Sequence, residues 1–316
     1  MWKRITLWSV VSLAMIAGGG LSYLFARKPA MRPAPDIKVE ITEARLARGK
    51  YLFESAAGCD DCHSERDFSR FSGPVVEGGH GKGSVFPASL GLPGHVVAPN
   101  ITPDPETGIG TWTDGEKIRA VREGVSRDGR ALFPLHPYED FRIMSDEDVY
   151  SLVAYLNSLP PVRNPLPPTQ LKFPVYLLIK SAPQPVVSVP QPERSNLVKY
   201  GGYLTVLAGC VGCHTPERNG KLVEERRLAG GREFRMPEVT LMSTNLTPDT
   251  GSGIGDWSEE FFMERFTQYR AFAQNGSPKV APDRLTLMPW VAYSQLDDED
   301  LRAIYHYLRT QPAIPN

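Results

Sequence analysis

The clearest pattern of apolar and polar positions in this chain is helical, and it occurs twice. After Ser145, a residue type that often caps helices, apolar residues recur on one helical face at Val149, Leu152, Val153 and Leu156. After Asp297, the same face is formed by Leu301, Ile304, Tyr305 and Leu308. Each run predicts a helix near the end of one half of the chain, packed against a core.

Two weaker helical patterns precede the first of these helices. One covers about residues 42–57, and the other begins near Trp112 or Thr113 and ends near Gly124. The remaining sequence is rich in turn-forming residues, because the 316 residues include 29 Pro and 28 Gly. We therefore expect an all-α fold in which short helices are joined by long loops.

The first 28 residues have the pattern of a targeting or anchoring segment. Lys3 and Arg4 precede an uncharged stretch of 22 residues from Ile5 to Ala26, which ends at Arg27 and Lys28. This length is close to what a helix needs to cross a bilayer, and it exceeds the core of a usual signal peptide. We expect an uncleaved transmembrane anchor, with a cleaved signal near Gly18–Gly20 as the alternative.

Short motifs divide the rest of the chain into two similar halves. The matched pairs are Gly49–Leu52 with Gly201–Leu204, Glu77–Gly79 with Ala229–Gly231, Asn100–Asp104 with Asn245–Asp249, Gly108–Trp112 with Gly253–Trp257, Leu135–Tyr138 with Leu287–Trp290, and Ser145–Asp148 with Asp297–Asp300. The second half therefore repeats the first.

The repeat predicts four parts. These are an anchor segment (1–34), a first domain (35–158), a Pro-rich linker (159–194) and a second domain (195–316). The linker contains ten prolines, which favour extended structure; it is either a spacer or a segment packed along both domains.

Charge changes this picture in one respect. The formal charge of the chain is only −1, which argues against a general nucleic-acid binder. Residues 35–158 nevertheless carry 20 acidic and 13 basic residues, whereas residues 194–316 carry 15 and 14. The acidic first half either aids solubility or docks a basic redox partner.

All four cysteines lie in two CxxCH motifs, Cys59-Asp60-Asp61-Cys62-His63 and Cys210-Val211-Gly212-Cys213-His214. Two thiols at this spacing on one helical turn can add to the two vinyl groups of one porphyrin, and the adjacent histidine can then bind its iron. A zinc site would need four ligands per cluster, and a redox dithiol would follow a strand. The motifs therefore predict two covalently bound haem c groups.

A low-spin electron-transfer haem needs a second axial ligand besides His63 or His214. In the second half the leading candidate is Met288, and Met236, Met242 and Met263 are alternatives. Met288 stands shortly before the last helix, a position on a loop distant from the CxxCH motif.

In the first half, the position matched to Met288 is His136. Met144 is an alternative ligand, but its counterpart in the repeat is Leu296, so packing is a sufficient role for it. We favour His63/His136 ligation over His63/Met144. The other histidines, His80, His95 and His306, are weaker candidates.

Taken together, the CxxCH motifs, the Asn-Ile/Leu-Thr-Pro-Asp segments, the Gly-Ile-Gly-x-Trp segments and the stretch from His136/Met288 to the acidic cap resemble membrane-bound diheme and multiheme c-type cytochromes. These include the cytochrome subunits of bacterial periplasmic dehydrogenases such as alcohol dehydrogenase. The resemblance covers about residues 40–160 and 195–312. It implies two tandem cytochrome c-like domains and relay of electrons between a donor and an acceptor protein.

We therefore expect an electron carrier, not an enzyme, on the periplasmic side of the inner membrane and anchored by a single N-terminal transmembrane helix. The histidine pair should give the first haem a lower potential than the His/Met pair gives the second. The alternative is a haem enzyme, such as a diheme peroxidase or an oxidase of a small inorganic substrate, with an open position on the first haem.

Overall fold

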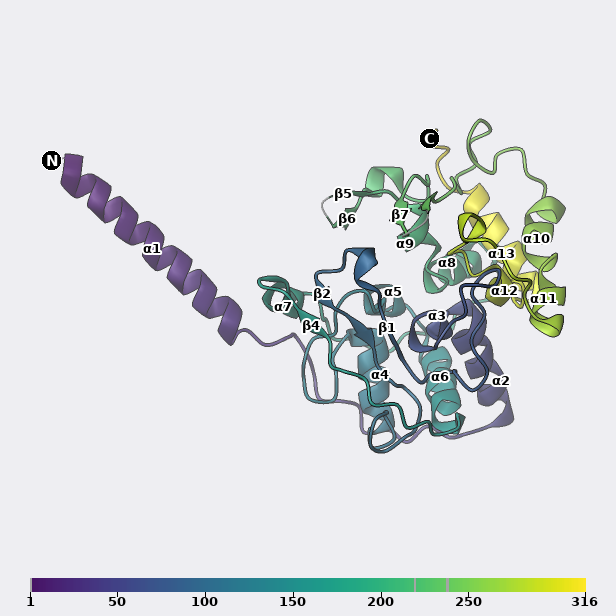
Figure 1. Cartoon of the computed structure of the whole chain (residues 1–316), viewed down its shortest axis with the longest axis horizontal. Coiled ribbons are helices and arrows are strands. Elements are labelled where there is room, and N and C mark those ends of the chain that lie inside the picture. The colour runs from purple at the N-terminus through teal and green to yellow at the C-terminus, as the bar shows by residue number, and fades with distance from the viewer. Residues whose placement is uncertain (1, 219, 237–238) are drawn as a thin grey trace.

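The computed structural model describes residues 2–218, 220–236 and 239–316. It is largely helical, and the helix α1 (Trp2–Ala26) projects from a body formed by the rest of the chain (Figure 1). The two halves of this body contain the same principal helices in the same order. Short antiparallel strand pairs occur only as two-stranded ribbons among the described residues.

The helices of the first half agree closely with the sequence pattern. They are α2 (Glu43–Tyr51), the π-helical turn η1 (Leu52–Ala56), α3 (Cys59–His63), α4 (Asp114–Glu123), α5 (Tyr138–Phe141) and α6 (Asp146–Ser158). Thr113 caps α4 in a capping box with Glu116, and the Oγ of Ser145 accepts a hydrogen bond from the amide of Asp148 at the start of α6. The predicted helix starts at these two caps are confirmed.

The second half repeats this order. Its helices are α8 (Leu197–Leu207), α9 (Cys210–His214), α10 (Glu259–Thr267), α11 (Arg270–Asn275), α12 (Trp290–Tyr293) and α13 (Asp298–Arg309). In each half the first helix crosses the last, α2 against α6 and α8 against α13. This crossing places the apolar faces predicted from the sequence in the core.

Loop segments form the short strands and 3-10 turns of both halves. The strand pairs are β1 (Ser84–Val85) with β3 (Val97–Ala98), β2 (Gly94–His95) with β4 (Gln170–Leu171), β5 (Glu217–Arg218) with β6 (Lys221–Leu222), and β7 (Glu233–Arg235) with β8 (Thr240–Met242). The 3-10 turns are η2 (Ala88–Leu90), η3 (Ile179–Ser181), η4 (Glu224–Arg226) and η5 (Pro282–Arg284).

Equivalent hydrogen bonds confirm most of the repeat and correct one match. Asn100 donates to the carbonyl of Val162, as Asn245 does to that of Ile314. The carbonyl of His63, however, accepts from Gly83, whereas that of His214 accepts from Gly230. Gly230 is therefore equivalent to Gly83, and the match of Glu77–Gly79 with Ala229–Gly231 is wrong. The first half contains Gly78 and Gly79 and, shortly after them, Gly81 and Gly83. Only the fold shows which of these glycines is equivalent to Gly230.

The Pro-rich segment is not a free spacer. Thr169 and β4 bond to the strands that follow the first motif, and the amide of Val186 donates to Glu123 at 3.1 Å. Further along, the amide of Asp146 donates to the carbonyl of Val189. The segment therefore packs along the first half, and its short helix α7 (Val175–Leu178) lies at the base of α1, where Phe25 contacts Tyr176 (Figure 1).

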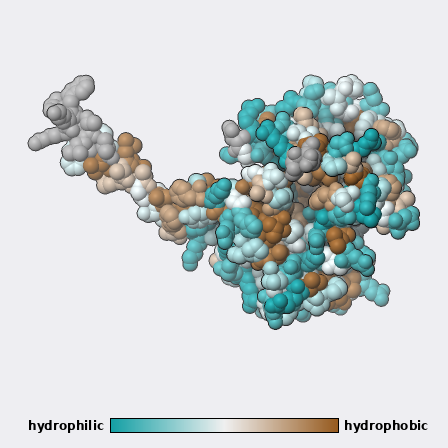
Figure 2. Space-filling view, in the orientation of Figure 1, coloured by the Kyte–Doolittle hydropathy of each residue, from teal (hydrophilic) through white to brown (hydrophobic). Residues whose placement is uncertain are grey.

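The prediction of a membrane-spanning anchor is wrong. Over the residues that the structure describes, no helix combines the length and the apolar character that crossing a membrane requires. Absence of charge was an insufficient criterion, because the stretch from Ile5 to Ala26 also contains three consecutive glycines and several serines. The predicted localisation, as a single-pass protein of the inner membrane, is therefore wrong as well. Figure 2 shows the mixed polar and apolar surface of the body beside this helix.

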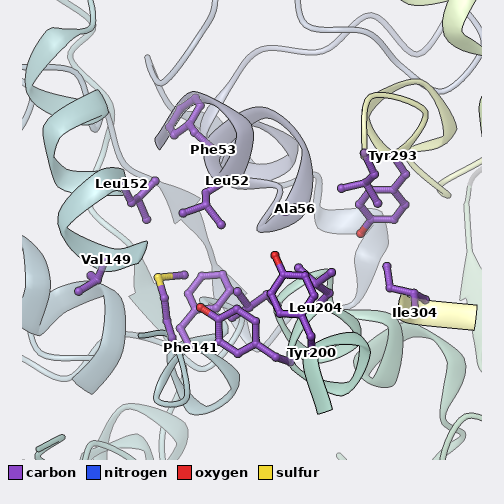
Figure 3. Packing of buried hydrophobic residues seen from close by; sticks show 14 of the residues in the cluster. Leu52, Phe53, Ala56, Phe141, Val149, Leu152, Tyr200, Leu204, Tyr293 and Ile304 are labelled. Atoms are coloured by element: carbon purple, nitrogen blue, oxygen red, sulfur yellow. The ribbon is translucent and has the colours of Figure 1, made fainter. Parts of the chain in front are cut away.

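One hydrophobic core extends through both halves. The buried cluster includes Leu52 and Ala56 from the first half and Tyr200, Leu204 and Tyr293 from the second. Figure 3 shows these side chains converging around η1, α8 and α12. The halves therefore hold each other in a fixed orientation, which places the two CxxCH turns inside one body.

Candidate functional site

The two CxxCH motifs form matching single-turn helices. Helix α3 follows Gly58 and helix α9 follows Gly209, and both glycines have the left-handed backbone conformation, with φ of 55° and 65°. Such a residue at the junction turns the chain sharply between the preceding helix and the motif. Both cysteines and the histidine of each motif are thereby presented from one short turn.

Each motif histidine is oriented by the same contact. The Nδ1 atom of His63 lies 2.8 Å from the carbonyl oxygen of Pro99, and that of His214 lies 2.8 Å from the carbonyl oxygen of Thr244. A carbonyl can only accept, so Nδ1 carries the proton and Nε2 keeps its lone pair. Burial lowers the pKa of both histidines, which keeps the rings neutral. Both are therefore prepared to bind a metal through Nε2.

The cysteine chemistry fits attachment better than zinc or dithiol redox chemistry. All four cysteines are free, and burial raises the pKa of Cys62 and Cys210 to about 12. A redox dithiol has a thiol of lowered pKa, and a structural zinc site needs four ligand side chains in one place. Of the residues placed by the structure, the one cluster of three metal-binding side chains is Glu54, Asp60 and His80, which includes no cysteine.

His136 lies opposite His63. The centroids of the two imidazole rings are 6.3 Å apart, and the ring planes are inclined by 74°. An imidazole nitrogen lies about 2 Å from a metal that it binds, so two imidazoles on opposite sides of one iron have ring centres about 6 Å apart. The spacing of this pair fits an iron atom between them.

The surroundings of His136 also suit a ligand. Burial lowers its pKa to about 3, so the ring is neutral at physiological pH. Its Nδ1 atom is buried and has no hydrogen-bond partner among the residues that the structure describes. The hydrogen bonds of the described residues thus leave a ring nitrogen of His136 unsatisfied. The residues at this position fit a haem.

Met144 has a complete role in packing. It is fully buried in the core beside the start of α6, and its counterpart Leu296 is 2% exposed. Arg122 donates to the carbonyl of Met144 at 3.0 Å, as Arg270 does to that of Leu296. Since leucine fills the same position in the second half, no iron ligation is needed to explain Met144.

Met288 occupies the position of His136 in the second half. The amide of Trp290 donates to the carbonyl of Met288 at 2.8 Å, and the amide of Tyr138 donates to that of His136 at the same distance. Met288 is half-buried and packs against the core cluster. Of the alternatives, Met242 is 63% exposed in β8, Met236 follows β7 in the connection between the two strands of the same ribbon, and Met263 packs from α10.

The remaining histidines have other partners. The Nδ1 atom of His80 lies 2.7 Å from Asp60, and the Nε2 atom of His306 lies 3.0 Å from Glu259. His95 is exposed in β2. None of the three lies in the position opposite a motif histidine.

The contacts between the halves could not be predicted from the sequence. The hydroxyl of Tyr51 donates to Asp300 at 2.7 Å, and that of its repeat counterpart Tyr203 donates to Asp148 at 2.6 Å. Both pairs were already visible as matched positions in the repeat, but nothing in the sequence indicated that the partners would be exchanged between the halves.

Comparison with known proteins gives consistent matches. A family model described as cytochrome c matches residues 199–312. The chain is 32% identical to a diheme cytochrome c-type protein of Cereibacter sphaeroides, over 96% of this chain and 97% of that protein. It is also 32% identical to one of the subunits of nicotinate dehydrogenase from Pseudomonas putida, over 98% of this chain but only 25% of that protein.

A third relative is the cytochrome c subunit of a quinone alcohol dehydrogenase from Gluconobacter oxydans, with 29% identity over 86% of this chain and 56% of that protein. This chain therefore spans about a quarter to about half of the dehydrogenase subunits, and nearly all of the Cereibacter protein.

Proposed function

Since this chain belongs to the diheme c-type cytochrome family, we propose that it holds two covalent haem c groups and relays single electrons between redox proteins. Like its relatives that are cytochrome c subunits of dehydrogenases, it is an electron carrier rather than a catalytic subunit. A haem c group supplies a reversible one-electron couple between ferric and ferrous iron. The protein's own residues attach such a group, orient it and set its potential.

In this proposal, residues 35–158 and 195–316 each hold one haem. Cys59 and Cys62 would form the thioethers of the first, and Cys210 and Cys213 those of the second. His63 and His214 would each bind iron through Nε2, with His136 and Met288 opposite them. The observation that carries the proposal is that each CxxCH turn presents a neutral histidine whose Nδ1 is already bound to a backbone carbonyl.

The two ligand sets should differ in potential. A thioether stabilises Fe(II) and raises the potential, whereas a second imidazole favours Fe(III) and lowers it. Electrons would therefore run downhill from the first half to the second. Because the halves share one core, the two sites keep a fixed separation, which suits transfer within one chain.

The partners we propose are a dehydrogenase as donor and a second redox protein as acceptor. The names of the Gluconobacter and Pseudomonas relatives support a dehydrogenase, but this chain covers only part of each. The acidic first half, with a net charge of −7 over residues 35–158, offers a docking face for a basic partner. The cytochrome c domain supports a periplasmic location.

A potentiometric titration followed by absorption tests this function. We expect two resolved one-electron components, of which only the higher keeps a near-infrared Met–Fe(III) signal when oxidised. Two equal high potentials would contradict the assignment of ligands. Rapid binding of carbon monoxide by one reduced haem would contradict the electron-carrier function, because a carrier has no open sixth position.

A further inference from the structure

A loop of the first half reaches across to the second half immediately after the first CxxCH motif. Within residues 66–73, the amide of Phe71 donates to the carbonyl of Pro278 at 2.8 Å, and the carbonyl of Ser69 accepts from Val280 at 3.0 Å. The guanidinium of Arg70 donates to the carbonyl of Ser277 at 2.8 Å. The loop therefore pairs with the segment that leads to Met288.

An aromatic contact anchors this loop. The Phe71 ring lies 4.9 Å from that of Tyr269 and 5.8 Å from that of Phe272, measured between centroids. Tyr269 in turn lies 5.6 Å from Trp290, two residues after Met288. Rings at these separations attract one another beyond the area that they bury.

Ser72 makes the contact nearest to Met288. Its hydroxyl donates to the Met288 carbonyl at 3.1 Å and accepts from the Val291 amide at 3.4 Å. The side chain is buried with 3% exposure, and its backbone has a φ of 62°, which non-glycine residues seldom adopt. In this unfavourable conformation, the Ser72 hydroxyl bridges the carbonyl of Met288 and the amide of Val291, on either side of the Met-Pro-Trp turn.

Arg66 connects the loop to the first motif. Its guanidinium donates to the carbonyls of Gly73 at 2.5 Å and Ser72 at 2.6 Å, and its Nη1 atom lies 2.8 Å from Asp61, inside the first CxxCH sequence. A continuous set of polar contacts therefore runs from the first motif to the Met288 turn.

The arrangement is one-sided over the part of the chain that the structure describes. The backbone hydrogen bonds around His136 go to Phe133 and Tyr138, both in its own half. Only the Met288 turn is held by a hydroxyl from the opposite half. A thioether is a weaker ligand than an imidazole, so its turn gains more from external support.

We propose that Ser72 is a positioning residue for Met288, and that the first half thereby stabilises the sixth ligand of the second haem. This inference rests on the proposed function, because it assumes that Met288 faces a haem iron. Ser72 does not touch the iron; it acts through the backbone on either side of Met288.

The test uses the haem-loaded full chain and follows the near-infrared Met–Fe(III) signal while imidazole is added to displace methionine. Ser72→Gly removes the hydroxyl but tolerates the positive φ, so the loop keeps its shape. Both hydrogen bonds of the hydroxyl are lost, and the shorter one alone, at about 1 kcal/mol, should lower the imidazole concentration for half-loss about five-fold. The matched control is Ser69→Ala, whose exposed hydroxyl donates to Asp67 within the loop, and which should leave the titration unchanged.

Two outcomes overturn the inference. If Ser72→Gly titrates like the wild type, Ser72 does not position Met288, although the proposed function still stands. If the wild type shows no Met–Fe(III) signal at all, the Met288 ligation fails and the inference fails with it. Arg66→Ala provides a second variant, and it should shift the imidazole titration in the same direction as Ser72→Gly.

Discussion

At position 136 the first half has histidine where the second half has methionine, while at position 144 it has methionine where the second half has leucine. The structure gives these residues different surroundings. His136 faces His63, and its buried Nδ1 atom has no partner within the described part of the chain, whereas Met144 is enclosed by the core. Comparison of the two halves could predict this difference from the sequence, because Leu296 shows that the position of Met144 needs only an apolar side chain.

Replacing Met144 by the residue of the other half tests this assignment. Met144→Leu should leave the spectrum of the first haem unchanged and alter the free energy of unfolding by less than about 1.5 kcal/mol, as volume-conserving core changes do. His136→Ala should change the spectrum of the same haem. Absorption of the oxidised protein distinguishes the two variants, and the opposite pattern would assign the ligand to Met144.

The pair His80 and Asp60 should make stability depend on pH. Its hydrogen bond to Asp60 raises the pKa of His80 above the ordinary 6.5. A group whose pKa is raised in the folded state stabilises the fold to its full extent at pH values below the pKa of the unfolded state. This stabilisation is lost as the pH rises through the pKa of the folded state. Denaturant titrations should therefore show that His80→Ala loses more stability relative to the wild type at pH 5.5 than at pH 9. The exposed His95→Ala is the control, and a difference that persists unchanged at pH 9 would refute the assignment.

Ser72 marks the limit of prediction at the residue scale. Its partners Met288 and Val291 are more than 200 residues away in the sequence, and serine in a loop has no pattern that points to them. The positive φ that fits the hydroxyl between the two halves results from the tertiary fold, not from any local preference for glycine.

Among the elements, the helices were the most predictable because periodicity and caps are local signals. The crossing of the first and last helices was not predicted, although its sequence requirement is simple. A methyl group at Gly49 would overlap the main-chain oxygen of Ser151, and one at Gly201 would overlap that of Ala303. These two glycines allow the helix backbones to touch in each half.

Gly49→Ala should therefore destabilise the fold by about 1–3 kcal/mol or more, the usual effect of overpacking a tight contact. Gly202→Ala is the matched control, since the atoms nearest to the added methyl belong to the ring of Tyr307, a side chain that can move. Thermal unfolding of the haem-loaded protein measures both. Equal effects of the two substitutions would show that close contact of the helix backbones at Gly49 does not determine how α2 packs on α6.

The Pro-rich segment shows why composition predicts less than periodicity. Its prolines favour extended structure, yet it contains α7 and η3, and its position depends on polar groups of the first half, such as Asn100, which donates to the carbonyl of Val162. The same bond from Asn245 fixes Ile314 near the C-terminus. The beginning of the Pro-rich segment, around Val162, is therefore equivalent in the repeat to the residues around Ile314. The two stretches differ in sequence, so comparison of the halves did not reveal this equivalence.

On the scale of the whole molecule, the halves exchange equivalent contacts across a shared core. Tyr51 donates to Asp300, and Tyr203 donates to Asp148, but the other hydrogen-bond partners of the two carboxylates differ. Asp148 also forms a bidentate pair with Arg48, whereas one buried oxygen of Asp300 finds no partner over residues 2–218, 220–236 and 239–316. Burial accordingly raises the pKa of Asp300.

Tyr51→Phe should thus cost more stability than Tyr203→Phe, about 1–3 kcal/mol at neutral pH, because it removes the hydroxyl that supports an otherwise poorly paired buried carboxylate. The deficit should shrink as pH falls through the raised pKa of Asp300, since the neutral acid needs less support. Denaturant unfolding at several pH values measures this. A larger loss in Tyr203→Phe would contradict the unequal support of the two acids.

Both CxxCH motifs should hold haem covalently within one chain. The most direct measurement is the mass of the mature protein after denaturation, followed by identification of the peptides that contain residues 59–62 and 210–213. We predict a chain that carries two haems, with one on each peptide. A chain with no haem or with only one, or one whose cysteines remain open to alkylation, would contradict the account.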